Sequence, residues 1–440
     1  MRIEELQHAL DDLAGNEPDV DGALRAVRSR ANRKRRRSWL GIGAVCALVI
    51  AAATFGVVRL RSGARHVSVV SPAAPPNDVA HFAWTRIAAP WSDIVRVVTA
   101  NAQTFAVGST PGVAVIYKID AGGAASIVFR GTGASDPRAI PAINDVAGVP
   151  GVLVAVGQAA VLPSGQVGAS AWRSTDDGRT WETVAVDPAP EVTAFTTILR
   201  VVVVNGEFYA FGKSYSSTPS ATCPNPVWTS NDGTHFRLTP TNPTGCSGYV
   251  DATDGPAGVV AATSENATAW TDDGGTWAPH LISTETAARV SAIDADADGY
   301  VAVGTTGDPA DSGTGAIWWS PDAKTWTRVA TDSPPANPKY QQASFTGVAH
   351  TAAGWIAVGW QLHPGGNPAV RDATLWTSPD GRHWTADTHD AGTFEQHAIA
   401  NRIGVTANGF AITGSANITG TGVPGDPIRK DNVLWTGSSA

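Results

Sequence analysis

Residues 154–181 read VAVGQAAVLPSGQVGASAWRSTDDGRTW, and this stretch contains two motifs that recur along the chain. The first is a short apolar strand that ends in a small residue and Gly. It stands at 105–108, 154–157, 209–212, 301–304, 356–359 and 411–414, with a degenerate copy at 259–262. The second is an Asp-containing turn between two aromatic residues, at 171–181, 227–236, 269–277, 318–326 and 375–384. The period of about fifty residues is near the repeat length of propeller blades.

Each repeat is expected to form four antiparallel strands, called a to d here. Two-residue turn signals such as Asn205-Gly206 and Asp298-Gly299 precede the Gly-ending motif, so strand a turns tightly into strand b. A connection of variable length leads to strand c, and the Asp-containing turn leads to strand d. The small residues of strand b favour a crowded position near the axis of the propeller.

The two ends of the repeat region fit together. The last repeat has no strand d after Trp435, while the segment Phe82–Ile87 matches the strand d text Trp326–Val329. The N-terminal strand is therefore expected to complete the final blade, which removes the open edges of a linear array. The fold prediction is all-β, a seven-bladed β-propeller over residues 79–440.

The repeated turn resembles the Asp-box, or BNR repeat, of sialidase-like and sortilin-like propellers. The stretch from Ser174 to Trp181 matches that box in full, and the other copies are shorter by one residue. The resemblance implies that the box is structural, with Asp capping the turn, Gly at positive φ and the aromatic residue packed between blades. The turn residues are Ser174, Asp176, Gly178, Trp181, Asp232, Asp273, Asp322 and Asp380.

The N-terminal part indicates a membrane anchor. Residues Trp39 to Val58 form a run of twenty residues without a charge, long enough to span a bilayer as a helix. A basic cluster at 28–37 precedes it, which places the N-terminus in the cytoplasm and the propeller outside the cell membrane. A cleaved signal peptide is the competing interpretation. Residues 1–38 are expected to form a short helical cytoplasmic segment that could dock a partner, and residues 59–78 a Pro/Ala linker.

The composition bounds the function. Charged residues are 16% of the chain, and residues 1–65 carry a net charge of +5 while the remainder carries −13. An acidic ectodomain argues against nucleic acid and anionic polymers as ligands. The b–c connections vary widely in length, which is typical of a recognition face. We therefore expect a non-catalytic module that binds an envelope glycan or protein. The alternatives are a sialidase-like exo-glycoside hydrolase and a structural assembly factor.

No catalytic residue, metal site or cofactor is predicted. The sialidase Arg-Ile-Pro signature is approached only at Arg86, inside the strand assigned to ring closure. The segment Asp294–Gly299 imitates a calcium loop, although a polar hairpin turn is favoured there. His363 stands in a b–c connection and is expected to be a surface histidine. The arginines that could converge in space are Arg96, Arg130, Arg138, Arg200, Arg289, Arg371 and Arg402.

Two cysteines stand in the third repeat. Cys223 and Cys246 flank its strands c and d, and an even pair outside the membrane usually forms a disulfide. A bond between them would close a loop of about two dozen residues and contribute on the order of 3 kcal/mol.

Overall fold

The computed structural model divides the chain into two compact units, residues 1–72 and 73–440. It describes residues 82–88, 93–110, 113–120, 123–131, 140–160, 167–189, 195–215, 225–239, 248–264, 266–307, 313–331, 343–351, 354–362, 371–386, 398–406, 409–419 and 429–439. The predicted cytoplasmic segment, span and linker lie outside these residues, as do Cys223, Cys246 and His363. Within the described part, no helix has the length and apolar character needed to cross a membrane.

The described residues form strands in repeated groups of four. The first four groups are β2 (Asp93–Ala100), β3 (Gln103–Thr110), β4 (Val113–Ile119), β5 (Ala125–Arg130); β6 (Ala142–Val149), β7 (Val152–Ala160), β8 (Val167–Ser174), β9 (Glu182–Val186); β10 (Phe195–Val204), β11 (Glu207–Tyr215), β12 (Val227–Ser230), β13 (His235–Leu238); β14 (Tyr249–Gly255), β15 (Gly258–Thr263), β16 (Thr268–Asp272) and β17 (Trp277–Leu281). The remaining strands are β18 (Arg289–Ala295), β19 (Tyr300–Thr306), β20 (Thr314–Ser320), β21 (Thr327–Val329); β22 (Ala343–Thr351), β23 (Gly354–Leu362), β24 (Arg371–Ser378), β25 (Thr385–Ala386); β26 (Ala398–Thr406), β27 (Gly409–Thr419), β28 (Arg429–Ser439) and β1 (Phe82–Ala88).

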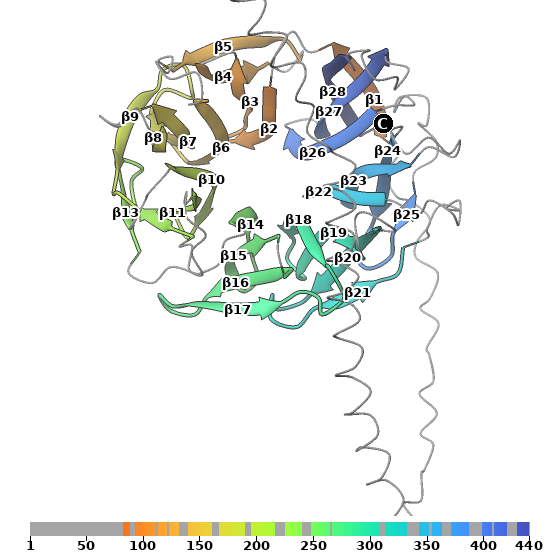
Figure 1. The fold of residues 1–440 in the computed structure, drawn as a ribbon. Coiled ribbons are helices and arrows are strands. Elements are labelled where there is room, and N and C mark those ends of the chain that lie inside the picture. The colour runs from red at the N-terminus through yellow and green to blue at the C-terminus, as the bar shows by residue number, and fades with distance from the viewer. Residues whose placement is uncertain are drawn as a thin grey trace, which may run out of the picture. The chain divides into compact units, whose positions relative to one another are not determined.

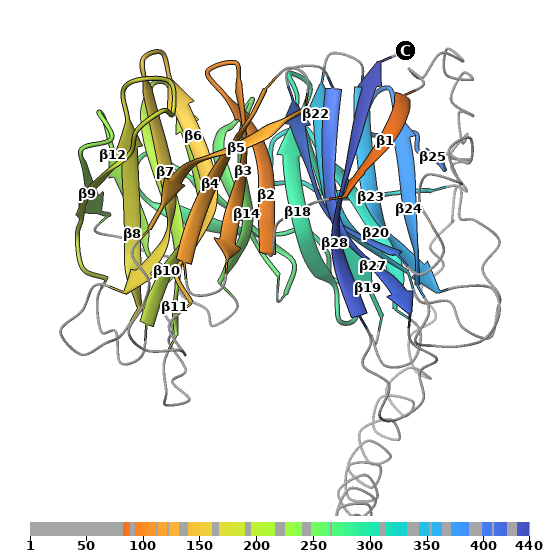
Figure 2. The same cartoon turned by 90° about the horizontal axis from the view of Figure 1, so that it is seen from above.

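These strands build a β-propeller, in which the sheets stand around a central axis (Figures 1 and 2). Five sheets have four strands each, and β6–β13 form a single sheet of eight strands, so the expectation of seven separate sheets is corrected. The eight strands join because β13 pairs in parallel with β9 at His235↔Ala185 and Phe236↔Val186. His235 Nε2 also lies 2.7 Å from Asp187 Oδ1, which reinforces this junction.

Ring closure by the N-terminal strand is confirmed. β1 pairs antiparallel with β28 along its whole length, from Phe82↔Ser439 to Ala88↔Val433. The sheet order β1-β28-β27-β26 therefore places the first strand of the described residues at the outer edge of the last sheet. Arg86 is one of its residues and pairs with Trp435 through the backbone, as the closure interpretation of that segment requires.

The innermost strands are the strands a, namely β2, β6, β10, β14, β18, β22 and β26 (Figure 1). The Gly-ending strand b is second from the axis (Figure 1), and its predicted crowded position has a specific cause. A Cβ on Gly157 would collide with the carbonyl of Ala142, and one on Gly304 would collide with the carbonyl of Arg289. Strand b is crowded by the strand a beside it.

Each innermost strand carries a β-bulge near its beginning. The register shifts lie at Ile94/Arg96, Ile143/Asp145, Ile198/Arg200, Tyr249/Asp251, Val290/Ala292, Phe345/Gly347 and Ala400/Arg402. A bulge adds one residue to a strand and changes the direction of the side chains that follow. The repeated bulge therefore gives seven residues at equivalent positions the same side-chain direction.

The c–d turns are held by aspartate side chains. Asp176 accepts hydrogen bonds from the backbone N–H groups of Arg179 and Thr180, at 3.0 and 2.9 Å, and Trp181 Nε1 donates to the Gly178 carbonyl. Equivalent backbone N–H groups donate to Asp232, Asp322 and Asp380.

Two copies of this turn depart from the pattern. In the fourth repeat Asp272 accepts the N–H of Gly275, whereas Asp273 forms an ion pair with Lys324. The carboxylate that caps this turn therefore belongs to Asp272 and not, as expected, to Asp273. In the fifth repeat Ala323 takes the glycine position at φ 58°.

Candidate functional site

The repeated bulge places one residue from each innermost strand in a ring around the axis. The ring consists of Arg96, Asp145, Arg200, Asp251, Ala292, Gly347 and Arg402. The bulges lie near the start of strands a, and strands a start on the face that carries the d–a and b–c connections. The charged ring therefore lies in the half of the channel nearer that face.

The first four members of this ring form an ion network in which Arg96 is partly exposed and the other three side chains are buried. Arg96 Nε lies 3.4 Å from Asp145 Oδ1, and Arg96 Nη1 lies 3.1 Å from Asp251 Oδ1. Arg200 Nε lies 2.6 Å from the same oxygen of Asp251. Burial opposes ionisation of Asp251, but Arg96, Arg200 and Arg402 outweigh it and hold the pKa of this carboxyl well below its usual range.

The aspartates also connect neighbouring innermost strands. Asp145 Oδ2 accepts the N–H of Val201 at 3.2 Å, and Asp251 Oδ2 accepts the N–H of Ile293 at 3.3 Å. These donors belong to the next strand a, which shares no ladder with the strand that carries the acceptor. The carboxylates therefore have a structural role, because they satisfy backbone N–H groups that face the channel.

Arg402 differs from the other two arginines. Its Nη1 donates to the carbonyls of Ser291 and Thr346, at 2.7 and 3.3 Å, and no carboxylate among the described residues lies within ion-pair distance. The ring positions in those two strands, Ala292 and Gly347, have no side chain beyond Cβ, which leaves room for the long Arg402 side chain. Burial and the nearby Arg200 lower the Arg402 pKa to about 10.

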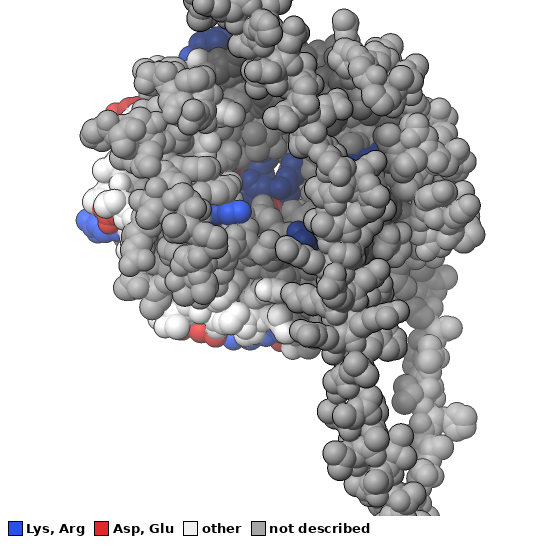
Figure 3. Space-filling model, viewed as in Figure 1, with Lys and Arg blue, Asp and Glu red and all other residues white. Residues whose placement is uncertain are grey.

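A third carboxyl lies two residues beyond Ala292. Asp294 accepts hydrogen bonds from Thr253 Oγ1, Ala295 N and His350 N at 3.1, 2.9 and 2.9 Å. Burial raises its pKa to about 6, and the charge of Asp251 adds to this increase. Positive and negative groups thus alternate in the central hollow, where Figure 3 shows Lys and Arg atoms with Asp and Glu atoms beside them. Three arginines face three aspartates at neutral pH.

The convergence of Arg96, Arg200 and Arg402 answers a question that the sequence left open. Arg371 lies elsewhere, over the Trp360 ring at 4.0 Å, Arg130 and Arg289 are exposed, and Arg138 lies outside the described residues. A sialidase-type nucleophile would require a Tyr–Glu pair beside the arginines.

A Tyr–Glu pair exists at another place. Tyr209 Oη donates to Glu207 Oε2 at 3.3 Å on β11, a strand b. Burial, Glu207 and Asp272 raise the Tyr209 pKa to about 12. Tyr209 packs against the core cluster that contains Phe211, Val259 and Trp277, between the third and fourth groups of strands, whereas the three arginines are in the ring around the axis. The two clusters are therefore separate.

The predicted calcium-like segment is a hairpin turn. Asp296 Oδ1 accepts the N–H groups of Asp298 and Gly299, at 2.8 and 2.9 Å, and β18 pairs with β19 across it. Among the described residues, no group of three or more His, Cys, Asp or Glu could hold a metal ion.

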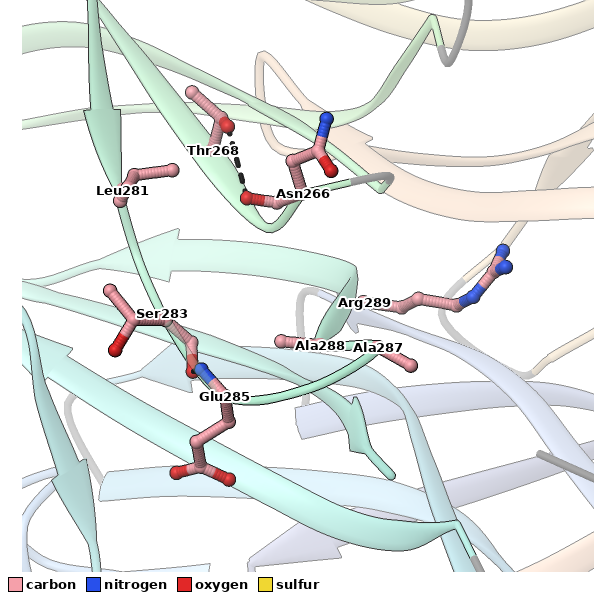
Figure 4. A pocket seen from close by; sticks show the side chains of 9 residues that line it. Asn266, Thr268, Leu281, Ser283, Glu285, Ala287, Ala288 and Arg289 are labelled. Atoms are coloured by element: carbon pink, nitrogen blue, oxygen red, sulfur yellow. Dashed lines mark hydrogen bonds between the residues drawn. The ribbon is translucent and has the colours of Figure 1, made fainter. Parts of the chain in front are cut away.

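A second candidate site opens on the face of the b–c and d–a connections. It is a pocket of about 620 Å³ between the sheet β14–β17 and the sheet β18–β21 (Figure 4). It is lined by Asn266, Thr268, Leu281, Ser283, Thr284, Glu285, Ala287, Ala288 and Arg289. Leu281 is on the outermost strand and Arg289 begins the innermost strand, so the pocket runs inward from the rim to the mouth of the channel.

Comparison with known proteins finds distant similarities to solved structures. No family model matches the chain, and no curated protein matches it. Among solved structures it is similar to a GH74 xyloglucanase from Xanthomonas campestris, with a TM-score of 0.49 and 16% identity over 80% of this chain and 55% of that one. The chain is also similar to the computationally designed Ika8 protein, with a TM-score of 0.38 and 12% identity over 78% of this chain and 95% of that one. For the GH43 protein BlXynB from Bacillus licheniformis the TM-score is 0.31, with 13% identity over 56% of this chain and 54% of that one. The chain thus spans about half the length of these two hydrolases.

Proposed function

We propose that the propeller is a non-catalytic binding module whose ligand, an envelope glycan or protein, is held at the channel mouth on the face of the b–c and d–a connections. The observation that carries this proposal is the gap in the charged ring. Ala292 and Gly347 leave one side of the ring without side-chain functional groups, and Arg402 reaches over that side without a carboxylate partner among the described residues. A guanidinium in this state has donor groups left for a ligand.

The other arginines support binding over catalysis. Arg96 and Arg200 already pair with Asp145 and Asp251, so a ligand carboxylate would compete with the protein's own. The carboxylates in turn hold neighbouring strands together, which ties this charge network to the fold. A catalytic carboxyl and nucleophile pair would instead be directed at the substrate.

The experiment is retention of the full-length protein on an insoluble cell-envelope fraction. Arg402→Gln is expected to reduce retention about tenfold, because a charge-assisted hydrogen bond is lost, and Arg402→Lys to reduce it less. Arg130→Gln removes an exposed arginine on the outer strand β5 and serves as the matched control. Equal retention of all variants, each with an unchanged unfolding midpoint, would refute the proposed site.

A sialidase-like exo-glycoside hydrolase is the second candidate function. The observation in its favour is the presence of Arg96, Arg200 and Arg402 at equivalent positions of the ring, because such a reaction would need arginines to hold a substrate carboxylate. The location of Tyr209 and Glu207 in a separate cluster opposes it.

The proposal also covers the parts of the chain outside the described residues. We propose that residues 39–58 attach the propeller to the cell membrane, with residues 1–38 in the cytoplasm. We also propose a disulfide between Cys223 and Cys246. The eight-stranded sheet corresponds to two blades joined at β9 and β13, which makes seven repeats of the Asp-box type. Mass spectrometry of alkylated protein, before and after reduction, tests the disulfide directly.

A further inference from the structure

The two aspartates of the charged ring make the same contacts in their repeats. Asp145 accepts the N–H of Val146, the next residue of its own strand, at 3.0 Å, and the N–H of Val201 on the following strand a at 3.2 Å. Asp251 accepts the two equivalent N–H groups of its own and the following strand a, at 3.1 and 3.3 Å. Each carboxylate thus bridges the N–H groups that come directly after two successive ring positions.

The next pair of strands in this alternation has no such carboxylate. The bridged pairs are β6 with β10 and β14 with β18, so the following pair is β22 with β26. The ring position of β22 is Gly347, and the equivalent N–H groups are those of Val348 and Ile403. Val348 pairs with Ala357 in the register in which Val201 pairs with Ala210, so its N–H faces the channel as well. Among the described residues, no aspartate stands at the ring position of this pair.

Arg402 lies beside the Gly347 position. Arg402 is the ring residue of β26, and its Nη1 donates to the carbonyl of Thr346, the residue directly before Gly347, at 3.3 Å. Each of the other two ring arginines has a carboxylate oxygen within 3.4 Å. The ring itself therefore holds three guanidinium groups and two carboxylates, and the excess positive charge is at the Gly347 position.

The third aspartate of the hollow is engaged elsewhere. Asp294 lies two residues along β18 from the ring position, and its Oδ2 accepts the N–H of His350 at 2.9 Å. His350 is two residues further along β22 than Val348. Asp294 thus bridges β18 to β22 below the ring and leaves the N–H groups of Val348 and Ile403 to another acceptor.

The Gly347 position is narrow. A Cβ on Gly347 would lie 3.0 Å from the backbone nitrogen of Ile403 and 3.2 Å from its Cγ2. A group that enters here must therefore be slim where it meets the N–H. An aspartate or glutamate side chain carries its carboxylate on a stem of one or two CH₂ groups, whereas the carboxylate of a sugar acid is attached directly to a wide ring. The geometry favours the side chain.

We propose that a partner protein inserts one aspartate or glutamate side chain into the channel, and that its carboxylate binds at the Gly347 position. The carboxylate accepts the N–H groups of Val348 and Ile403 and pairs with Arg402, as Asp251 does with its own two N–H groups and Arg200. Hydrogen bonds between ionised groups and backbone donors of this kind are short and strong. This inference rests on the proposed function and narrows its ligand to a protein that presents a single carboxylate.

The first test supplies the carboxylate from within the chain. Gly347→Asp adds it, and Gly347→Asn adds a neutral side chain of equal size. The thermal unfolding midpoint of the Asp variant is expected to lie above that of the Asn variant, although the ectodomain is already acidic. Gly347→Asp is also expected to lose retention on the envelope fraction, because its own carboxylate takes the position of the ligand. An Asp variant no more stable than the Asn variant would refute the inference.

The second test uses the wild-type full-length protein and small probes at pH 7 and constant ionic strength. Acetate is expected to raise the unfolding midpoint as its concentration rises, since it binds the native state, whereas acetamide and glucuronate are expected to leave it unchanged. Arg402→Gln should weaken acetate binding about tenfold, because a charge-assisted contact is lost, and Arg130→Gln should have no effect. The absence of an acetate response, or an equal response to acetamide, would contradict the proposed carboxylate site. An equal response to glucuronate would contradict the choice of a side-chain carboxylate.

Retention on the envelope fraction separates this inference from the proposed function. Protease treatment of the fraction is expected to abolish retention, and unchanged retention would exclude a protein partner. If acetate has no effect while Arg402→Gln still reduces retention, only the carboxylate assignment is wrong. If acetate binds through Arg402 while Arg402→Gln leaves retention unchanged, the carboxylate site stands and the channel mouth does not hold the envelope ligand.

Discussion

Asp251 holds the most connected position in the channel, and its replacement gives a sharp test of the charge network. The side chain is 4% exposed and accepts hydrogen bonds from Arg96, Arg200 and the backbone N–H groups of Ala252 and Ile293. Asp251→Asn keeps the shape but removes the charge, so the buried guanidinium of Arg200 loses its partner. Breaking one partner of a buried pair costs about 3–5 kcal/mol, and we expect a loss of this size in the free energy of unfolding.

Urea denaturation of the full-length protein at pH 7 measures this loss. The matched control is Asp273→Asn, which removes a carboxylate from an ion pair with Lys324 whose two side chains are 49% and 45% exposed. Exposed pairs contribute less than about 1 kcal/mol, so the control is expected to change little. A loss below about 1 kcal/mol for Asp251→Asn would refute the claim that the arginines are neutralised from within the protein.

Three further predictions concern the channel, the bulges and the closing strand. The Asp294 pKa is raised from 3.8 to about 6, so the native state binds more protons than the unfolded state between these values and the contribution of Asp294 to stability falls as pH rises through that window. Denaturation across pH 4–7 should therefore show Asp294→Asn gaining stability relative to wild type up to about pH 6 and no further; a constant difference would contradict this. Gly157→Ala should lower the unfolding free energy by more than 2 kcal/mol, because Cβ meets the backbone carbonyl of Ala142, whereas Gly151→Ala, at φ 82° with nothing within 4 Å, should cost only about 1 kcal/mol. Deletion of Phe82–Ala88 should leave β28 with an open edge and cause concentration-dependent association in light scattering, unlike a deletion that ends before Phe82.

The sequence predicted the repeat, the propeller and the closing strand because these depend on local patterns. The Gly-ending motif, the Asp-containing turns and the match of Phe82–Ile87 to a strand d are all contiguous in the chain. The joining of β9 to β13 was not predicted, since it depends on a two-residue parallel pairing and the contact of His235 with Asp187.

The charged ring was found only in part. The three arginines were among seven that could converge, but nothing marked which would do so, because each belongs to a different repeat. Their partners Asp145 and Asp251 were not predicted at all. The signal that would have found them is the alignment of the repeats at strand a, where the residue after the bulge is charged in five of seven copies.

The central claim is that the propeller binds its ligand without chemical turnover. The most direct measurement incubates the full-length protein with a fluorogenic sialoside and, in parallel, with the envelope fraction, and records released fluorophore, released sugar and retained protein. The proposed function predicts retention that depends on Arg402 and no release of fluorophore or sugar above the rate without protein. Release that is abolished by Arg402→Gln would contradict it and would establish the channel as the active site of a hydrolase.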